Sequence, residues 1–268
     1  MNSASTEAPT TPWAVLNGLE IGCVQYLNAR PLIHAYDGDV SFDHPAVLAR
    51  KMAARELDAG LVPIFEALRA GDYWAVDEVA IACDGPVFSV FLAHDRPLAE
   101  LRRIHLDPAS ATSVHLLKVL LAEFHGLQPE YRTDAEAECR DARLLIGNQA
   151  IEFRRTHRAT HQFLDLGAEW KRCTGLPFVF AVWLLQRDLA DRSALADAFR
   201  DLRAAGLAQL SEIIATEEFQ NEAFRSAYLG GHIRYALGPA EKEAVAKFRT
   251  LLVKHGFVDQ QTAKLAYC

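Results

Sequence analysis

Apolar residues along this chain follow, in turn, the two-residue period of strands and the 3.6-residue period of helices. In the first third, the pattern predicts strands at residues 19–24, 40–42 and 57–63. It also predicts helices at residues 31–36 and 45–56, and a third with Pro63 in its first turn. Asp43 is placed to cap the second of these helices. Short strands that alternate with helices are typical of an α/β fold.

Two longer apolar runs stand apart, at residues 87–93 and 178–185. Between them the pattern predicts a strand at 104–106, a helix at 112–124 and a strand at 144–146. If each long run is a strand that crosses between lobes, residues 94–177 form an inserted lobe. Residues 19–93 and 178–268 then form the other lobe. The sequence therefore predicts a two-lobed α/β protein with a central cleft and two crossover strands.

Both ends of the chain differ from the middle. After residue 185 the apolar spacing predicts helices at 194–215, 217–228 and 239–255, which we expect to pack on the first lobe. Residues 1–18 mix small polar residues with prolines and predict a flexible tail, not a signal peptide. The longest apolar stretch has only about half of the roughly 20 residues that a membrane helix needs.

Composition narrows the possible partners. The net charge of −7 is spread along the chain without long charged runs, which argues against binding to nucleic acid or to a membrane surface. The five cysteines are widely separated and form no C-x-x-C pair, so we expect a reduced, cytoplasmic protein. Because the net charge is negative, an anionic ligand would have to be attracted by groups at its own binding site. The sequence leaves the oligomeric state open.

Several turns at predicted strand ends carry polar residues or glycine. Thr112 and Ser113 stand at a helix start, where hydroxyl and free N–H groups make a plausible cradle for a carboxylate. Ordinary helix capping explains the same residues, because Ser and Thr are common caps. Further turns of this kind are Asp84-Gly85-Pro86 with Ser89 behind it, Gly147-Asn148, and Gly175 ahead of Phe178. These turns would face one cleft, where open α/β sheets bind ligands.

Known metal and cofactor motifs are missing from the sequence. His157 and His161 have the i, i+4 spacing of metal ligands, but no acidic or cysteine partner completes a motif around them. No G-x-S-x-G, Walker or G-x-G-x-x-G string occurs. We therefore expect no metal site, and the sequence gives no support for a serine hydrolase or for binding of a nucleoside triphosphate or a dinucleotide.

Short strings follow one another in a specific order between residues 19 and 257. They are YLNARPL from residue 26, LDAGLVP from 57, DGPVFSV from 84, LDP from 106 with TS at 112, LIG from 145, DLGAEW from 165 with TGLPFVFA from 174, and IRYALGP from 233. In this order they resemble the chorismate dehydratases of the futalosine route to menaquinone.

The resemblance implies a fold and a reaction. The fold is that of the type II periplasmic binding proteins, used as an enzyme without a cofactor. The reaction is loss of water from chorismate to give 3-[(1-carboxyvinyl)oxy]benzoate. The related 1,4-dihydroxy-6-naphthoate synthases share this fold, and the string at residues 233–239 favours the dehydratase.

The resemblance also suggests roles for residues. We expect Asn28 and Ser89 to be catalytic, with Asn28 close to the leaving hydroxyl. The expected substrate-binding residues are Gln25, Tyr26, Arg30, Asp84, Gly85, Pro86, Thr112, Ser113, Gly147, Asn148, Gly175 and Phe178. By the same resemblance, the enolpyruvyl carboxylate of the substrate takes the ring proton.

The chain departs from the family pattern at two positions. Gln25 stands where the family usually has Ser, and Asn148 stands where Asp commonly follows Ile-Gly. Gln25 brings a longer amide side chain to its turn, and Asn148 removes a negative charge near an anionic ligand. Two other functions use the same architecture: a cytoplasmic sensor or binding protein for a small aromatic carboxylate, and the sister synthase.

Overall fold

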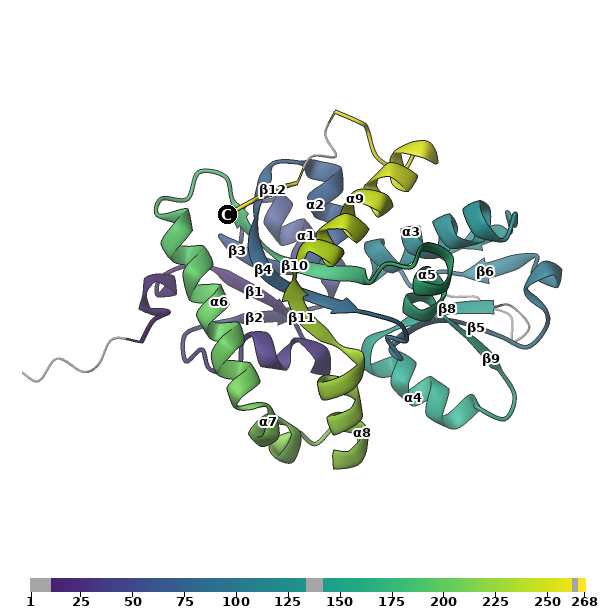
Figure 1. The fold of residues 1–268 in the computed structure, drawn as a ribbon, viewed down its shortest axis with the longest axis horizontal. Coiled ribbons are helices and arrows are strands. Elements are labelled where there is room, and N and C mark those ends of the chain that lie inside the picture. Colours follow the sequence, from purple (N-terminus) through teal and green to yellow (C-terminus); the bar gives the residue numbers. More distant parts are fainter. Residues whose placement is uncertain (1–10, 134–141, 262–264) are drawn as a thin grey trace, which may run out of the picture.

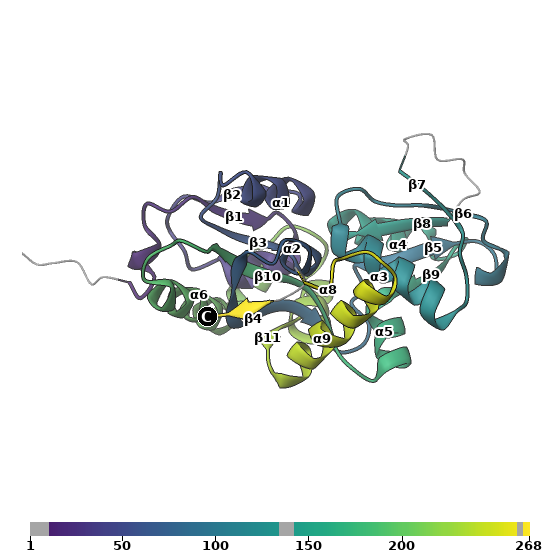
Figure 2. The same cartoon turned by 90° about the horizontal axis from the view of Figure 1, so that it is seen from above.

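The computed structural model describes residues 11–133, 142–261 and 265–268. The strands of these residues form two sheets that lie side by side, each covered by helices (Figures 1 and 2). The larger sheet has the order β11-β4-β10-β3-β1-β2, with β12 paired to β4, and the smaller has the order β7-β6-β8-β5-β9. The chain is thus a two-lobed α/β protein, as predicted.

Lobe 1 is built on the larger sheet. Its strands are β1 (Ile21–Val24), β2 (Ser41–Asp43), β3 (Ala59–Pro63), β4 (Tyr73–Cys83), β10 (Phe178–Gln186), β11 (Arg234–Leu237) and β12 (Ala266–Tyr267). All nine residues of β10 are buried, because this strand lies antiparallel between β3 and β4 in the middle of the sheet.

Lobe 2 is built on the smaller sheet. Its strands are β5 (Val90–His94), β6 (Arg103–His105), β7 (Glu130–Arg132), β8 (Ala142–Ile146) and β9 (Gln162–Asp165). Strand β5 lies antiparallel between β8 and β9, and β6 runs parallel to β7 and β8.

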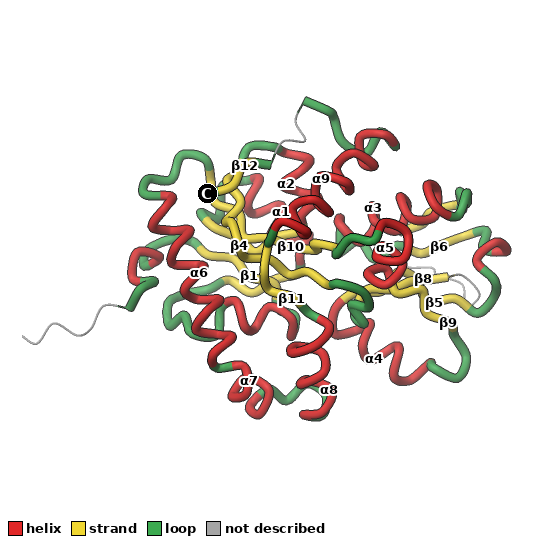
Figure 3. The backbone as a smooth tube through the Cα atoms, viewed as in Figure 1, coloured by secondary structure: helices red, strands yellow, loops and turns green. Residues whose placement is uncertain are grey.

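Helices cover both sheets. Figure 3 draws the helices in red and the strands in yellow. The α-helices are α1 (Pro45–Ala53), α2 (Ile64–Ala70), α3 (Ala111–Val119), α4 (Gly147–His157), α5 (Leu166–Thr174), α6 (Arg192–Ala208), α7 (Leu210–Thr216), α8 (Glu222–Ala227) and α9 (Pro239–Lys254). Short 3₁₀ segments are η1 (Ala14–Leu16), η2 (Leu27–Leu32) and η3 (Leu98–Glu100), and single π-helical turns are η4 (Leu120–Phe124) and η5 (Tyr228–His232).

The C-terminal helices pack through aromatic contacts. Trp183 of β10 stacks on Phe199 of α6 at 4.3 Å between ring centroids. Phe248 of α9 meets both Phe178 of β10 and Trp170 of α5, so α9 contacts both lobes. Figure 1 shows α7 and α8 below the larger sheet and α2 and α9 above it. The prediction that these helices pack on lobe 1 therefore holds for α6, whereas α9 bridges the lobes.

The chain crosses between the lobes in loops and not in strands. Strand β5 pairs only within the smaller sheet, although the sequence pattern assigned residues 87–93 to lobe 1 as a crossover strand. The first crossing is residues 84–89, and the second is residues 175–177, just before β10. Burial alone cannot distinguish these arrangements, because a fully buried strand has the same apolar pattern in either sheet.

Residues 11–18 are not a flexible tail. Residues 14–16 form η1, and Leu16 is completely buried in the core. The backbone oxygen of Leu16 also accepts a hydrogen bond from Tyr36. The apolar side chains of this segment, Trp13 among them, explain the difference, because they pack against the core. Residues 1–10 of the predicted tail lie outside the described residues.

Other element boundaries also differ from the predictions. The helix expected at residues 31–36 is η2, which starts at Leu27 and holds Pro31 inside it, so Asn28 lies in a helical turn and not in a loop. Helix α1 has His44 as its N-cap, while Asp43 binds Lys51 instead.

The predicted helix at 194–215 breaks at Gln209 into α6 and α7, so that both helices contact η2. The helix predicted at 217–228 starts only at Glu222, where the side chain of Asn221 caps it. Strand β4, the longest partner of β10, was not predicted.

Candidate functional site

A cavity lies between the lobes where strand ends and helix starts from both sheets meet. Its empty space is about 520 Å³, part of it open to solvent. The apolar part of its lining is Val24, Pro45, Pro63, Ile81, Val87, Val90, Ile146, Phe180 and Ala181. The polar part is Tyr26, Asn28, Ser89, Ser110, Thr112, Ser113 and Gly147. Phe180 offers an aromatic wall.

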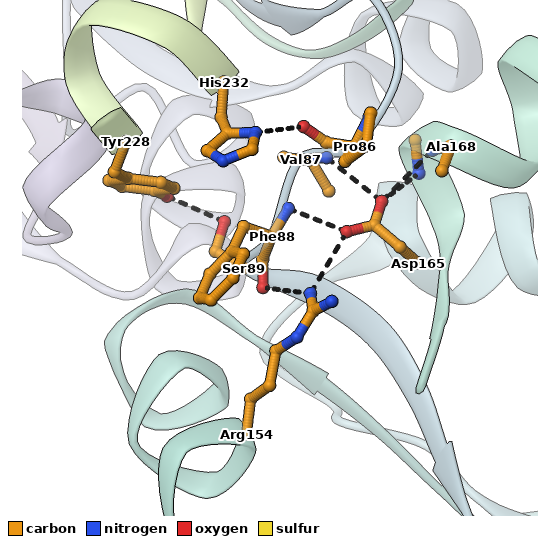
Figure 4. Close-up of polar contacts among 10 residues, drawn as sticks. Pro86, Val87, Phe88, Ser89, Arg154, Asp165, Ala168, Tyr228 and His232 are labelled. Atoms are coloured by element: carbon orange, nitrogen blue, oxygen red, sulfur yellow. Dashed lines mark hydrogen bonds and ion pairs between the residues drawn. The ribbon is translucent and has the colours of Figure 1, made fainter. Parts of the chain in front are cut away.

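Asn28 and Ser89 meet beside a buried tyrosine. The hydroxyl of Tyr228 donates to Ser89 Oγ over 2.7 Å, as Figure 4 shows, and both residues are fully buried. Burial raises the pKa of Tyr228, while the polar side chains of Ser89 and Asn28 beside it act in the opposite direction. The carbonyl oxygen Oδ1 of Asn28 is buried and finds no hydrogen-bond partner among the described residues.

The start of α3 brings three hydroxyl groups to the other side of the cavity. Ser110 is the N-cap of α3: its Oγ accepts from the backbone N–H of Ser113 and donates to Ser113 Oγ over 2.8 Å. Thr112 Oγ1 accepts from the backbone N–H of Phe65 in lobe 1. Because the oxygens of Thr112 and Ser113 each accept a protein hydrogen bond, their protons remain available to a ligand.

One carboxylate holds the first crossing in place. Asp165, the N-cap of α5, accepts from the backbone N–H groups of Val87 and Phe88 at 3.0 and 2.8 Å, and from two N–H groups in the first turn of α5 (Figure 4). Phe88 has a φ of 68°, a conformation that is costly for a residue with a Cβ atom. The four N–H groups on Asp165 stabilise this conformation, which places Ser89 in the cavity.

Two further contacts flank this crossing. Arg154 of α4 donates to the backbone oxygen of Phe88 and lies 4.2 Å from its ring centroid. The Nδ1 atom of His232 donates to the backbone oxygen of Pro86 at 3.0 Å. The crossing is thereby tied to lobe 2 through α4 and α5 and to lobe 1 through η5.

The mouth of the cavity joins the two lobes. The side-chain oxygen of Asn148 in α4 accepts a hydrogen bond from the backbone N–H of Leu27 in η2 at 3.3 Å. Gly147 has a φ of 65°, and a Cβ atom there would lie 2.7 Å from the ring of Tyr26. Glycine is therefore required at this position both for the backbone conformation and for the close approach of the lobes.

Titratable groups near the mouth have altered pKa values. Burial, helped by the charge of Asp107, raises the pKa of Tyr26 to about 12, so its phenol stays protonated. Burial also raises the pKa of Asp107, although its oxygens accept hydrogen bonds from Ala109 and Gln149. These bonds occupy both oxygens of Asp107, which does not line the cavity.

Six of the predicted site residues line the cavity: Tyr26, Asn28, Ser89, Thr112, Ser113 and Gly147. Others lie elsewhere. Arg30 pairs with Glu217 at 2.8 Å, so it does not supply a cation to the cavity. Gln25 is exposed and contacts His44, and Asn148 holds the lobes together rather than lining the cavity.

The remaining predicted residues belong to the crossings and the core. Asp84 binds Lys171 at 2.6 Å and Arg234 at 2.8 Å, and the hydrogen bond from Lys171 lowers its pKa. Gly85, with φ 123°, and Pro86 continue the first crossing, and Gly175 ends α5 with φ 75°. Phe178 is buried against Phe248, whereas Phe180, two residues further on, reaches the cavity.

Sequence reasoning missed four residues at this site. Ser110 lies inside the recognised string before α3, and its place as a cap could have indicated it. Phe180 has the same strand parity as Phe178, but the pattern cannot say which of the two reaches the cavity. Asp165 opens the recognised string DLGAEW and caps α5, but its contacts with Val87 and Phe88, 77 or more positions away, gave no signal. Tyr228 carried no signal, because its partner Ser89 is 139 positions away.

No metal site is evident in residues 11–133, 142–261 and 265–268: no three His, Cys, Asp or Glu side chains gather there in a way that could hold an ion. His157 and His161 stand edge to face at 5.4 Å beside Phe153. Among the same residues, no helix has the length and apolar character to cross a membrane.

Comparison with known sequences gives consistent matches. A family model described as menaquinone biosynthesis matches residues 19–254. The chorismate dehydratase of Thermus thermophilus is 34% identical over 219 residues, which are 74% of this chain and 80% of that protein. The chorismate dehydratase of Campylobacter jejuni is 28% identical over 158 residues, 58% of each chain.

Comparison with solved structures supports the fold. A protein from Archaeoglobus fulgidus aligns with a TM-score of 0.72 at 15% identity, over 90% of this chain and 98% of that one. The alkanesulfonate-binding protein of Xanthomonas axonopodis, bound to MOPS, aligns with a TM-score of 0.61 at 14% identity, over 93% and 98% of the two chains. The architecture is therefore that of the periplasmic binding proteins.

Proposed function

This chain belongs to the menaquinone biosynthesis family, and from that premise we propose that it is a chorismate dehydratase, which converts chorismate to 3-[(1-carboxyvinyl)oxy]benzoate and water. The name of the Thermus relative, 34% identical to this chain, supports this activity over that of the sister synthase. The observation that carries the proposal is a cavity lined by hydroxyl groups from both lobes, beside an aromatic wall.

An uncharged cavity lining can bind a dianionic substrate if its hydrogen-bond donors point toward the carboxylates of that substrate. Chorismate carries two carboxylates, and the first N–H groups of α3 with the protons of Thr112 and Ser113 provide donors for one of them. Hydrogen bonds to an ionised acceptor are roughly twice as strong as neutral ones. The cavity thus binds an anion through fixed dipoles, without a lysine or arginine in its described lining.

Ser89 and Asn28 fit the leaving group. The reaction breaks the C4–O bond and the C3–H bond of the ring, and the electron pair of the C–H bond completes an aromatic ring. The hydroxyl of Ser89 donates to the departing oxygen, while Asn28 Oδ1 accepts the proton that this oxygen still carries. The hydrogen bond from Ser89 stabilises the negative charge that develops on the leaving oxygen, and the contact with Asn28 Oδ1 orients the hydroxyl group.

The ring proton needs an acceptor, and the cavity offers no obvious protein base. No carboxylate, imidazole or amine belongs to its lining among the described residues, and Tyr26 stays protonated. This composition supports the enolpyruvyl carboxylate of the substrate as the base, which the enzyme needs only to position. The carboxylate then passes this proton to the leaving hydroxide, so that water forms and the product carboxylate is ionised again.

Incubation of the purified protein with chorismate tests this function. We expect a product 18 mass units lighter with new aromatic absorbance, in buffer without added metal or cofactor. Tight binding of aromatic carboxylates without turnover would identify a binding protein instead. Turnover of a cyclic futalosine derivative, with chorismate left intact, would identify the sister synthase. The cytoplasmic location stays a prediction.

A further inference from the structure

Ser89 receives a hydrogen bond from a part of the chain that the cavity itself does not include. Tyr228 opens η5, the π-helical turn after α8, and its hydroxyl lies 2.7 Å from Ser89 Oγ. Single π-helical turns are rare and recur at functional sites. Figure 4 shows the phenol of Tyr228 approaching Ser89 from lobe 1, on the side away from Arg154.

The direction of this hydrogen bond is that of a phenol donor. Tyr228 donates to Ser89 Oγ, so the single proton of the phenol is directed at Ser89. The side chain of Asn28 lies close enough to influence the ionisation of this phenol, and its Oδ1 atom has no partner in the described part of the chain.

The hydrogen bond from Tyr228 to Ser89 has a fixed direction. Burial raises the pKa of Tyr228, so its phenol keeps the proton that it donates to Ser89 throughout the physiological range. Ser89 Oγ, which accepts from Tyr228, must then point its own proton elsewhere. The open direction is the cavity, because Ser89 lines it. The Oδ1 atom of Asn28, buried and without a partner among the described residues, is likewise left for the ligand.

We propose that Tyr228 is a positioning residue that makes Ser89 a donor toward the leaving hydroxyl of the substrate, beside the free acceptor Oδ1 of Asn28. This inference rests on the proposed dehydratase function, since it assigns the groups that meet the departing oxygen. Tyr228 does not touch the substrate. It acts by removing the alternative arrangement, in which Ser89 donates to the protein and turns its lone pairs toward the ligand.

The substitution Tyr228→Phe tests the inference, because it removes only the hydroxyl. We expect kcat to fall about tenfold while KM changes less than twofold, since the effect falls on the leaving group and not on binding. Tyr235→Phe is the matched control. Tyr235 is buried nearby in β11, and its hydroxyl has no hydrogen-bond partner among the described residues, so kcat should stay within twofold of wild type.

A double variant separates positioning from a general loss of packing. Tyr228 acts only through its neighbours in this scheme, so Ser89→Ala with Tyr228→Phe should be no slower than Ser89→Ala alone. If the losses of kcat in the two single variants multiply in the double variant, the inference is overturned. A folded Tyr228→Phe protein with wild-type kcat would also overturn it. A wild-type protein that leaves chorismate intact would instead contradict the proposed function.

A second variant covers the case in which Tyr228→Phe does not fold. Replacing Tyr228 by 3,5-difluorotyrosine keeps the ring and the hydroxyl but makes the phenol more acidic. We expect kcat to decline at a lower pH than in the wild type, because an ionised phenolate cannot donate to Ser89. Identical pH profiles for the two proteins would contradict the inference.

Discussion

At the scale of single residues, Asn28 holds an unusual place for an amide. Its Oδ1 atom is buried at the cavity and has no hydrogen-bond partner among the described residues, a state that normally costs free energy. Such a cost is expected where a ligand completes the hydrogen bond. In the proposed reaction, this ligand is the leaving hydroxyl of the substrate.

Replacing Asn28 by Ala should lower kcat by about 100-fold, as loss of one positioned group at a developing charge typically does. The melting temperature should change little, because the oxygen that is removed binds nothing in the protein. Steady-state kinetics and thermal unfolding measure both effects. Asn17→Ala is the control, since Asn17 is exposed and distant from the cavity lining. An Asn28→Ala enzyme with wild-type kcat would refute this role.

The sequence predicted part of this residue-level picture. Strings that lie next to the cavity were recognised by their order, and Asn28, Ser89, Thr112 and Ser113 line it. Tyr228 could not be found in this way, because its helical stretch shows only the apolar spacing of a core helix. Its partner Ser89 is 139 positions away, and only the tertiary fold brings them together.

At the scale of elements, the position of η2 depends on α6. A Cβ atom at Gly206 of α6 would lie 1.9 Å from the backbone oxygen of Pro31 in η2, so the two backbones touch. Backbone atoms cannot move aside as a flexible side chain can. This contact supports the segment that carries Asn28.

Gly206→Ala should destabilise the protein by about 3 kcal/mol, the upper part of the usual range for overpacking. It should also lower kcat/KM, because α6 and η2 must separate. Chemical denaturation and a turnover assay provide the two readouts. Gly231→Ala, in a position with open space around it, should leave both within error. Equal stability of wild type and Gly206→Ala would show that the contact is not tight.

Helix α3 is held against lobe 1 by a neutral histidine. His115 stacks on Phe65 of α2 with 3.7 Å between ring centroids, and its Nδ1 atom donates to the backbone oxygen of Ala111. Burial lowers the pKa of His115 to about 4. The unfolded chain therefore takes up a proton near pH 6.5, whereas the folded protein does so only near pH 4.

This difference predicts a pH dependence of stability. The contribution of neutral His115 is fully present above pH 6.5 and is lost as the pH falls toward 4, by up to about 3 kcal/mol. His115→Phe should remove this component from the curve of unfolding free energy against pH. The exposed His34, replaced by Gln, serves as the control. Parallel curves for wild type and His115→Phe would rule out the assignment.

The sequence predicted elements correctly where the local apolar pattern determines the structure. It failed where the pairing of strands determines the sheet to which a segment belongs. The amphipathic spacing located α1 and α9 to within a few residues. The assignment of residues 87–93 to lobe 1 failed, because strand pairing is not visible in an apolar run. The residues expected in the tail include Leu16, whose burial depends on contacts with distant elements.

At the scale of the whole molecule, the two lobes meet around the cavity through a few direct hydrogen bonds. Leu27 N donates to Asn148 Oδ1 at 3.3 Å, and Ala46 N donates to the backbone oxygen of Ala109 at 3.2 Å. Both bonds join lobe 1 to lobe 2. The two residues that depart from the family pattern, Gln25 and Asn148, lie outside the cavity lining.

Asn148→Ala should weaken closure and raise KM about tenfold, while kcat stays within threefold, because the groups at the leaving hydroxyl are untouched. Asn148→Asp keeps an acceptor for Leu27 N and should retain a KM near that of wild type. Gln149→Ala is a further control, since Gln149 binds Asp107 within lobe 2. A KM unchanged in Asn148→Ala would argue against a role for this bond in closure.

The most direct test compares wild type and Ser89→Ala in their conversion of chorismate, followed by the appearance of aromatic proton resonances. We expect the wild type to form 3-[(1-carboxyvinyl)oxy]benzoate and the folded Ser89→Ala protein to form it at least 100-fold more slowly. Intact chorismate after incubation with folded wild type, or equal rates for the two proteins, would contradict the assignment of dehydration to this cavity.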